Sequence, residues 1–448
     1  METNDTDAGE TGYATALLPG VSHPLRESVN NELHARPFEP LKPPARASHL
    51  AVVTGESDEV AREKRAHFLR LCARYDVAPP GEGAKHFVQD LGPFRVRWER
   101  HGEFCTYTFL RDGPFADPFA DPVINLVPRD WLDTIPGQVL VAAHVALEDR
   151  DAPEREAVAL SRLFNHHGLI GSGIGGGNAM MWTDLRVDQD GFTRFLVRDV
   201  DLHDRQAGRA VQRLLEIHTY SSMALLALAP ARDAIPRIAR CDAVLSEITH
   251  RLGMLRDVDD ERALLGEITG LAGEVERIAA ATNYRFGAAR AYYELVLTRL
   301  NELREQRVDG FQRLSVFLDR RLGPAMRTCQ ATSERQETLA AHVARASNLL
   351  RTRVDVALEA QNQGVLQSMN RRAQLQLRLQ ATVEGLSVAA ISYYVVGLIG
   401  HIAEALESSG LPIEPDVVSG VAIPFVVGTV WYGIRHVRQL ATRDDETG

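Results

Sequence analysis

Up to about residue 200, the chain alternates between short apolar runs and polar breaks. The runs at 48–55, 85–111 and 139–147 are rich in β-branched and aromatic residues, a composition typical of strands. The runs that flank Asp188–Gly191 predict a hairpin, because the glycine can adopt the left-handed turn conformation. Residues 21–200 are therefore predicted to form an α+β domain, an α/β unit whose sheet is largely antiparallel and carries helices.

Two helices are predicted between these strands, and one segment is unusually rich in glycine. Ser57 is expected to open a helix that runs to about Tyr75, and Pro153 a helix that runs to about Phe164. The segment 168–178, GLIGSGIGGGN, is predicted to be a flexible or tightly turned structural loop. The alternative is a site where backbone amides bind a phosphate, although the GK[ST] ending of a P-loop is missing.

From about residue 201 the pattern becomes helical, and no further strand is expected. Helices are predicted to end at Pro230, to run from about Pro236 to Ala281 with a break near 257–260, and to continue from Tyr284 to Leu322. Gly323-Pro324 is predicted to end one helix and to start the next. The proline-free stretch that follows, up to Gln380, predicts a rod of about 85 Å at ~1.5 Å per residue. Residues 201–382 are thus expected to form a helical bundle or stalk.

Two long apolar segments follow, at 383–403 and 417–434. The first has one ionisable side chain, His401 at its end, and the second has none. Each is long enough to cross a ~30 Å hydrocarbon core, so a two-helix transmembrane hairpin is predicted. The alternative is an apolar helical pair inside a soluble assembly.

The flanking charges predict the orientation of this hairpin. Arginines precede the first segment and follow the second, whereas the loop 404–416 has no Lys or Arg. By the positive-inside rule, both termini and the tail 435–448 face the cytoplasm, and the loop faces the periplasm of a bacterial inner membrane. The first twenty residues lack the pattern of a signal peptide and are expected to be a disordered lead.

Small and aromatic residues in the two segments are candidates either for helix packing or for lining a pore. The packing interpretation rests on small residues at four-residue spacing, which allow helices to approach closely within the hairpin or between subunits. The pore interpretation rests on polar side chains in the first segment. The candidates are Ser392, Tyr393, Tyr394, Gly397, Gly400, Gly420, Pro424 and Gly428.

Two groups of acidic residues stand out, and the second is a candidate site for a divalent cation. The loop between the apolar segments carries Glu404, Glu407, Glu414 and Asp416. A second cluster lies between predicted helices and comprises Asp257, Asp259, Asp260 and Glu261. Carboxylates can hold a divalent cation, but acidic residues also favour the first turn of a helix, which is the simpler interpretation of the second cluster.

Composition excludes several classes of function. The net charge of −10 argues against nucleic-acid binding, which needs a basic surface. The four cysteines are far apart and form no zinc or disulfide pattern. No GxSxG or HExxH motif is present, so no enzyme is predicted, and no cofactor is expected other than a possible divalent cation.

Two resemblances extend this picture. The segments HPLRESVNNELHARPFEPLKPPARASHLAV, WTDLRVDQDGFTRFLV, QAGRAVQRLLEIHTYSSMALLAL and LSVAAISYYVVGLIGH resemble an uncharacterised proteobacterial family of membrane-anchored proteins, catalogued as a domain of unknown function (DUF3422). That resemblance implies a membrane location and no particular activity. The order of α/β domain, long helix and C-terminal hairpin is also similar to CorA-type magnesium transporters. The Gly-Met-Asn motif of that family is absent, since the matching positions read Gly397 to His401.

The leading functional hypothesis is a homo-oligomeric membrane protein of CorA-like architecture that conducts a cation. A ring of copies would cover the apolar surface that a long rod and a lone hairpin leave exposed. The alternative is a membrane-anchored sensor or scaffold whose α/β domain binds a ligand or a protein partner.

Overall fold

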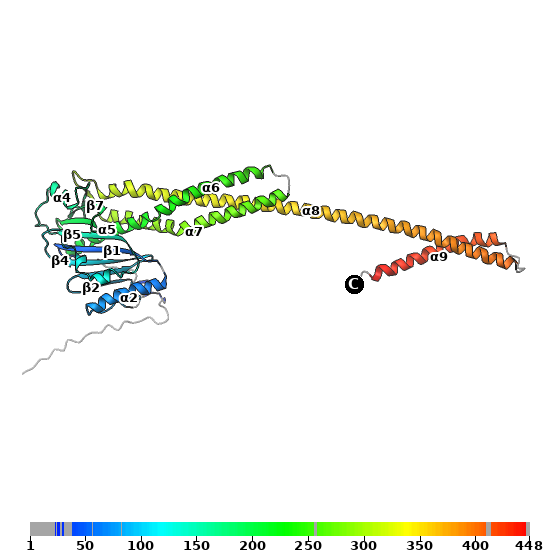
Figure 1. Ribbon diagram of the computed structural model, residues 1–448, viewed down its shortest axis with the longest axis horizontal. Coiled ribbons are helices and arrows are strands. Elements are labelled where there is room, and N and C mark those ends of the chain that lie inside the picture. Colours follow the sequence, from blue (N-terminus) through cyan, green and yellow to red (C-terminus); the bar gives the residue numbers. More distant parts are fainter. Residues whose placement is uncertain are drawn as a thin grey trace, which may run out of the picture. The chain divides into compact units, whose positions relative to one another are not determined.

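The structure is a computed structural model of the whole chain (Figure 1). It describes residues 38–55, 57–81, 83–254, 258–408 and 414–444, together with His23, Leu25, Arg26, Val29 and Asn30. The predicted disordered lead lies outside these residues. The chain divides into two compact units, Met1–Glu247 with Gly270–Ala344, and Ile248–Thr269 with Arg345–Gly448, and each is described by itself.

The described part of the first unit contains one mixed sheet of nine strands, in the order β2-β3-β4-β1-β5-β8-β7-β6-β9. Neighbouring strands run antiparallel, except that β5 and β8 run parallel. The strands are β1 (Ala45–Val53), β2 (His86–Asp90), β3 (Arg95–Arg100), β4 (Phe104–Asp112), β5 (Gln138–Glu148), β6 (Ile170–Ile174), β7 (Ala179–Val187), β8 (Thr193–Asp199) and β9 (Gln306–Arg307). The predicted α/β domain with a largely antiparallel sheet is confirmed.

Local signals in the sequence account for several of these elements. Helix α2 (Asp58–Arg74) begins after Ser57, whose side chain accepts a hydrogen bond from the Val60 amide, as expected of an N-cap residue. The β7–β8 hairpin turns at Asp188–Gly191, where Gly191 has a φ of 84°. The second predicted helix begins later than expected, since α4 spans Ala157–Leu163.

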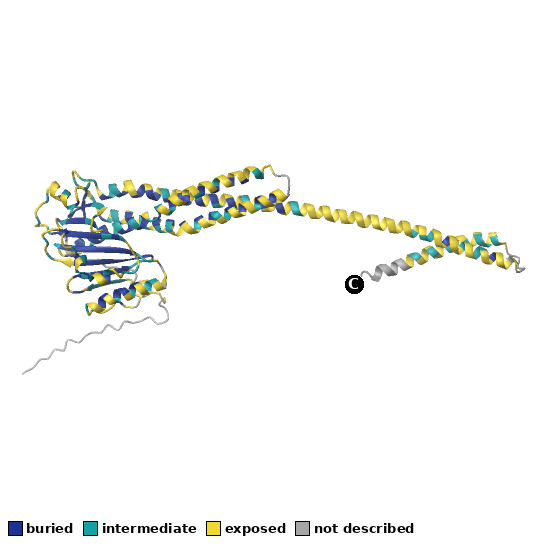
Figure 2. Cartoon of the chain, in the orientation of Figure 1, coloured by how far each residue is buried: buried dark blue, intermediate teal, exposed yellow. Residues whose placement is uncertain are grey.

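Both faces of the sheet are covered. On one face, α2, the short helices η1 (Val123–Leu126) and α3 (Arg129–Leu132), and α4 pack on aromatic residues of the strands. On the other face, α5 (Asp204–Leu225) lies on β5 and shares a core with parts of α7 (Val258–Glu302) and α8 (Leu314–Ser408). Figure 2 shows the strands as the most buried part of this unit. Polar side chains in the middle of the sheet, such as His49 and Arg97, are therefore buried.

The helical region departs from the prediction at its breaks. Pro230 does not end a helix, because it lies in the first turn of α6 (Leu228–Leu252), where a backbone N–H has no helical partner in any case. The break before 258 is confirmed, as α7 begins at Val258. The break predicted at Gly323-Pro324 is wrong: Pro324 lies inside α8. Buried Leu322, Ala325 and Met326 pack into the core there and offset the lost hydrogen bond.

The true break lies between α7 and α8, and it contains a strand. β9 pairs with β6 at the edge of the sheet, so the expectation of no strand after residue 201 is wrong. The glycine-rich segment 168–178 is likewise only partly a loop, because Ile170–Ile174 forms β6. β9 is only two residues long, which is too short for the alternation of apolar and polar residues that predicts a strand.

The second unit contains α9 (Pro415–Asp444) and the C-terminal part of α8. Among the described residues, α8 and α9 are the helices long and apolar enough to cross a membrane. The most apolar stretch of α9 has none of its residues buried within the chain. Figure 2 shows these helices as largely exposed, which is unusual for apolar side chains in water.

Candidate functional site: a charged cavity beneath helix α5

Strand alternation places a group of polar side chains on the sheet face that α5 covers. In β3, Val96 and Trp98 point to the α2 side, so Arg97 and Glu99 point to the α5 side. Their neighbours on β4 and β1 are Thr106, Thr108 and His49. All five are buried. A polar row on a covered face requires polar partners.

Helix α5 supplies those partners on the face it turns to the sheet. Gln212, Glu216 and Thr219 recur at the spacing of helical turns and therefore share one side of the helix. Arg299 joins them from α7. Two polar faces, one from the sheet and one from the helices, thus meet in the interior of the first unit.

These faces line a cavity of about 270 Å³ that is partly open to solvent. Its walls combine the charged groups with apolar side chains, among them Phe104, Leu110 and Leu215. The segment at Phe38–Leu41 also lines it, held by a hydrogen bond from the Leu41 amide to the Asp204 carbonyl (3.1 Å). A Cβ at Gly208 would lie 1.7 Å from the Glu39 carbonyl oxygen, so glycine allows this segment to cross α5.

A continuous chain of hydrogen bonds and ion pairs runs along the cavity. Arg97 Nη2 donates to Glu99 Oε1 (2.7 Å), and Arg97 Nη1 donates to Gln212 Oε1 (2.6 Å). Gln212 Nε2 in turn donates to Glu216 Oε1 (2.7 Å), whose other carboxylate oxygen accepts from Arg299 Nε. The chain ties β3 to α5 and α5 to α7. Each buried charge in it has a partner of opposite sign.

The electrostatics of the cavity follow from burial and from these pairs. Burial alone would raise the pKa of the Glu99 carboxyl, but Arg97 holds it below its ordinary value. Burial lowers the pKa of His49 to about 3, so its imidazole is neutral at physiological pH. The two ring nitrogens of His49 lie 2.8 Å from Thr108 Oγ1 and 3.2 Å from Thr219 Oγ1. The site therefore holds fixed ion pairs and a neutral imidazole.

One strong donor in this site has no acceptor. The Nε–H group of Arg97 is buried and has no hydrogen-bond partner within the described protein. Leaving a buried donor unsatisfied costs about 1–3 kcal/mol, and more when the group is charged. Nε itself has almost no surface that a water-sized molecule can reach, so this donor does not reach the cavity that other atoms of Arg97 line. The charged and polar walls of the cavity can accommodate a small polar molecule.

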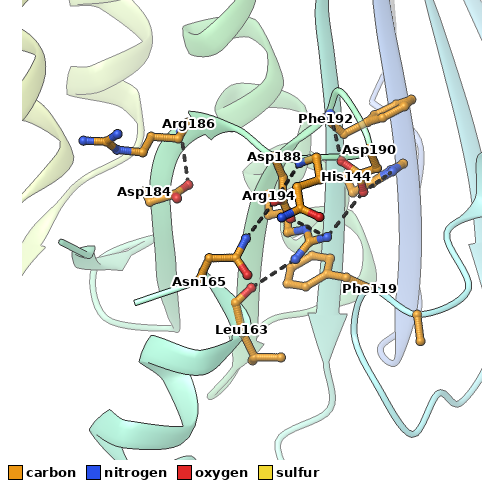
Figure 3. Close-up of polar contacts among 12 residues, drawn as sticks. Phe119, His144, Leu163, Asn165, Asp184, Arg186, Asp188, Asp190, Phe192 and Arg194 are labelled. Atoms are coloured by element: carbon orange, nitrogen blue, oxygen red, sulfur yellow. Dashed lines mark hydrogen bonds and ion pairs between the residues drawn. The ribbon is translucent and has the colours of Figure 1, made fainter. Parts of the chain in front are cut away.

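A second polar cluster lies on the opposite face of the sheet and resembles a Ser–His–Asp arrangement, of which Figure 3 labels His144 and Asp190. Ser48 Oγ lies 3.0 Å from His144 Nδ1, and His144 Nε2 lies 4.0 Å from Asp190 Oδ2. Ser48 is completely buried and also accepts a hydrogen bond from the Ile124 amide (3.1 Å). His144 stacks on Phe192, with ring centroids 3.9 Å apart. With no access for a substrate to Ser48, this cluster is structural.

The glycine-rich segment does not offer free amides to a phosphate. The amides of Gly175 and Gly176 donate to the carbonyls of Leu303 and Arg304 (2.8 and 3.1 Å). The Gly177 amide donates to the Ile174 carbonyl (3.1 Å). All three glycines have positive φ, which the turn requires. The tightly turned structural interpretation is confirmed for 175–177.

The predicted residues of the apolar helices separate into two groups. Ser392 is buried, and Gly400 faces α9, where an added Cβ would lie 3.1 Å from Ser419 Oγ. Gly400 therefore lies at a point where α8 and α9 approach each other. The remaining candidates are exposed, and an added Cβ at any of their glycines would meet no atom within 4 Å: Tyr393, Tyr394, Gly397, Gly420, Pro424 and Gly428.

The acidic candidates are not gathered into one site by the described residues. Glu404 lies 3.3 Å from His401, and the Glu414 carbonyl accepts from the first amides of α9. Asp416 and Asp260 are exposed, Asp259 pairs with Arg262, and Glu261 pairs with Arg353. Asp257 and the side chain of Glu407 lie outside the described residues. No group of three or more His, Cys, Asp or Glu side chains in the described ranges is arranged to hold a metal ion.

Fold and site together define a class: an α/β domain with a charged cavity that is partly open to solvent, in a chain with two helices long and apolar enough to cross a membrane. The chain belongs to the DUF3422 family, described as proteins of unknown function, whose model matches residues 21–440. Neither the comparison with curated proteins nor that with solved structures gives a significant match. The family expected from the sequence is thus confirmed, and it assigns no activity.

Proposed function

We propose that this protein is a membrane-anchored ligand-binding protein whose α/β domain holds a small polar molecule in the cavity beneath α5. The observation that carries the proposal is a cavity of about 270 Å³ whose charged and polar walls are joined in a chain of hydrogen bonds from Arg97 to Glu216. That volume is close to the lower end of the ~300–1,000 Å³ typical of small-molecule sites. The ligand is therefore expected to be the size of a small metabolite.

The composition of the cavity supports binding over a purely structural role. Replacing a buried ion pair by packed apolar side chains is often neutral or stabilising, so stability alone does not favour Arg97 and Glu99 at these positions. Fixed ion pairs around a cavity, by contrast, are already oriented for a polar ligand and need little reorganisation. The apolar wall at Leu110 and Leu215 would accommodate an aliphatic part.

The anchor in this proposal is the pair of apolar helices. No charged residue lies within 385–400 or 417–434, whereas arginines flank both segments. We therefore place the protein in a bacterial inner membrane with both termini in the cytoplasm. Cysteine labelling from the outside at Ser408, against Ser315 as an internal control, tests this topology.

The binding proposal is tested by releasing bound molecules from the detergent-purified full chain. Heat release followed by mass spectrometry is expected to show a small molecule from the wild type and from Arg46→Met, an equally buried arginine outside the cavity. The yield from Arg97→Met should fall at least roughly tenfold, since a hydrogen bond to a charged group contributes about 1.5–3 kcal/mol. Equal yields from Arg97→Met and the wild type would refute the proposal.

Cation conduction by a ring of copies is a second candidate, and one feature of α9 favours it. Gly420, Pro424 and Gly428 form an exposed face that the hairpin itself does not use, so it is available to another copy of the chain. Oligomer mass in detergent and cation flux into liposomes test this candidate. Replacing Gly397 and Gly400 by tryptophan should abolish any flux through the hairpin.

A further inference from the structure

A second pocket, separate from the charged cavity, lies at the surface of the first unit, where α5 meets the loop that follows α7. It has a volume of about 430 Å³. Its polar lining consists of three arginines and three amide side chains: Arg209, Arg213, Arg304, Asn178, Gln206 and Asn301. Glu302 is the one carboxylate of this lining. The side chains are half-buried or exposed, so a ligand can reach them from solvent.

The arginines are brought together by two features of the fold. Arg209 and Arg213 lie one turn apart on α5 and so point to the same side of the helix. Arg304 enters from the loop after α7, where its φ of 47° turns the chain sharply. Its Nη2 donates to the Gly175 carbonyl (3.1 Å). The glycine turn 175–177 thus fixes an arginine at the pocket instead of binding an anion through its own amides.

Charge in this pocket is unbalanced in favour of cations. Arg213 Nε donates to Glu302 Oε2 (3.2 Å), and the same oxygen accepts from Arg299 Nη1 (3.0 Å). Arg209 lies over the ring of Phe38, 5.6 Å from its centroid, and has no carboxylate partner among the described residues. Three guanidinium groups against one carboxylate leave about two positive charges, in a chain whose net charge is −10. The pocket is therefore positively charged in a chain that is negatively charged overall.

We propose that this pocket binds a phosphate monoester. Guanidinium groups pair with phosphate oxygens through two parallel hydrogen bonds, and the amide side chains supply further donors. A phosphate monoester carries about −1.5 to −2 charges at neutral pH, which matches the pocket, whereas a single carboxylate would neutralise only half of it. The phosphate can belong to a soluble metabolite or to the head group of an anionic lipid. The proposal does not rest on ligand binding in the cavity beneath α5, although Arg299 of that cavity also donates to Glu302.

The test is calorimetric titration of the full chain with glycerol 3-phosphate, at constant ionic strength and pH 7.5. The wild type is expected to bind, and Arg209→Gln and Arg304→Gln should each weaken binding roughly tenfold. Arg232→Gln, an exposed arginine on α6 outside the pocket, makes the same charge change and should leave the affinity within twofold. Absence of wild-type binding, or equal weakening in Arg232→Gln, would overturn the proposal.

Glu302→Gln gives a result that misfolding cannot imitate. Removing the pocket's carboxylate raises its positive charge and frees donors of Arg213, so glycerol 3-phosphate should bind at least threefold more tightly. Unchanged or weaker binding by a folded Glu302→Gln protein counts against the site.

Repeating the titration in nanodiscs with and without phosphatidic acid distinguishes a lipid head group from a soluble phosphate ester. If phosphatidic acid competes with glycerol 3-phosphate and Arg209→Gln abolishes this competition, the natural ligand is a lipid head group. If phosphatidic acid does not compete, the natural ligand is a soluble phosphate ester.

Discussion

Replacing Arg97 by methionine should destabilise the α/β domain strongly, because it leaves a carboxylate buried without its cation. The Arg97 and Glu99 side chains are only 6% and 10% exposed, and Arg97 Nη2 lies 2.7 Å from Glu99 Oε1. Removing one partner of such a pair costs about 3–5 kcal/mol. The change also removes the donor to Gln212, although methionine fills much of the volume of the arginine stem. We therefore expect a loss near the lower end of that range.

The loss should depend on pH in a defined direction. Without Arg97, burial dominates the environment of Glu99 and raises its pKa above the unfolded value. The variant then loses stability only at pH values at which the carboxyl is ionised in the unfolded state. Its free energy of unfolding therefore falls further below that of the wild type as the pH rises from 4 to 8. The double variant Arg97→Met/Glu99→Met removes both charges and should recover most of the stability at every pH.

Urea unfolding of the detergent-solubilised chain, followed by tryptophan fluorescence, measures these effects, because Trp98 and Trp131 lie in the core next to β3. The free energy of unfolding should fall by about 3 kcal/mol in Arg97→Met at pH 7.5 and by less at pH 5. A loss under about 1 kcal/mol would show that the pair is solvated. A double variant no more stable than the single one would refute the role given to Glu99.

Three further predictions concern the same domain. Burial lowers the pKa values of His49, His144 and His218 to about 3, 4 and 4, below their unfolded value of 6.5. Their neutral forms stabilise the fold above pH 6.5, so the free energy of unfolding in urea should fall from there toward pH 4, by up to about 1.4 kcal/mol per pH unit for each histidine. A free energy of unfolding that stays constant over this range would contradict the burial of these histidines. Gly208→Ala should cost about 1–3 kcal/mol by displacing the segment at Glu39, whereas Gly287→Ala, with no atom near its added Cβ, should be neutral or stabilising in the same assay. Arg285 donates to both carboxylate oxygens of Glu103 (2.6 and 2.7 Å), so Glu103→Gln should lower the thermal midpoint by several degrees, and an unchanged midpoint would show that the pair contributes nothing.

Much of the α/β domain could be predicted because its signals are local. Ser57 caps a helix through its own side chain, and Gly191 turns a hairpin through its own backbone. The misplaced breaks have a tertiary cause. Pro324 remains in a helix because its neighbours are buried, and β9 exists because β6 offers an edge to pair with. Neither cause can be found in the residues next to the break.

The charged cavity could not be predicted, because each of its walls looks like a solvent-facing surface when considered alone. The alternation of Arg95, Arg97 and Glu99 with apolar residues is what a half-exposed strand shows. The turn-spaced Gln212 and Glu216 look like the polar side of a surface helix. Only the packing of α5 on the sheet shows that these two polar faces meet each other. The usable signal is that β3 and α5 each carry a row of polar residues although both elements belong to the core of the domain. Two such rows together indicate a polar cavity between the elements.

The most direct test of ligand binding is a high-resolution density map of the full chain purified gently from its membrane. The account predicts ordered, non-protein density in the cavity beneath α5, with a polar atom about 3 Å from a polar side chain of the lining. The same density should be absent from Arg97→Met and present in Arg46→Met. A cavity that holds only water in the wild type, or that is closed by the side chains around it, would contradict the account.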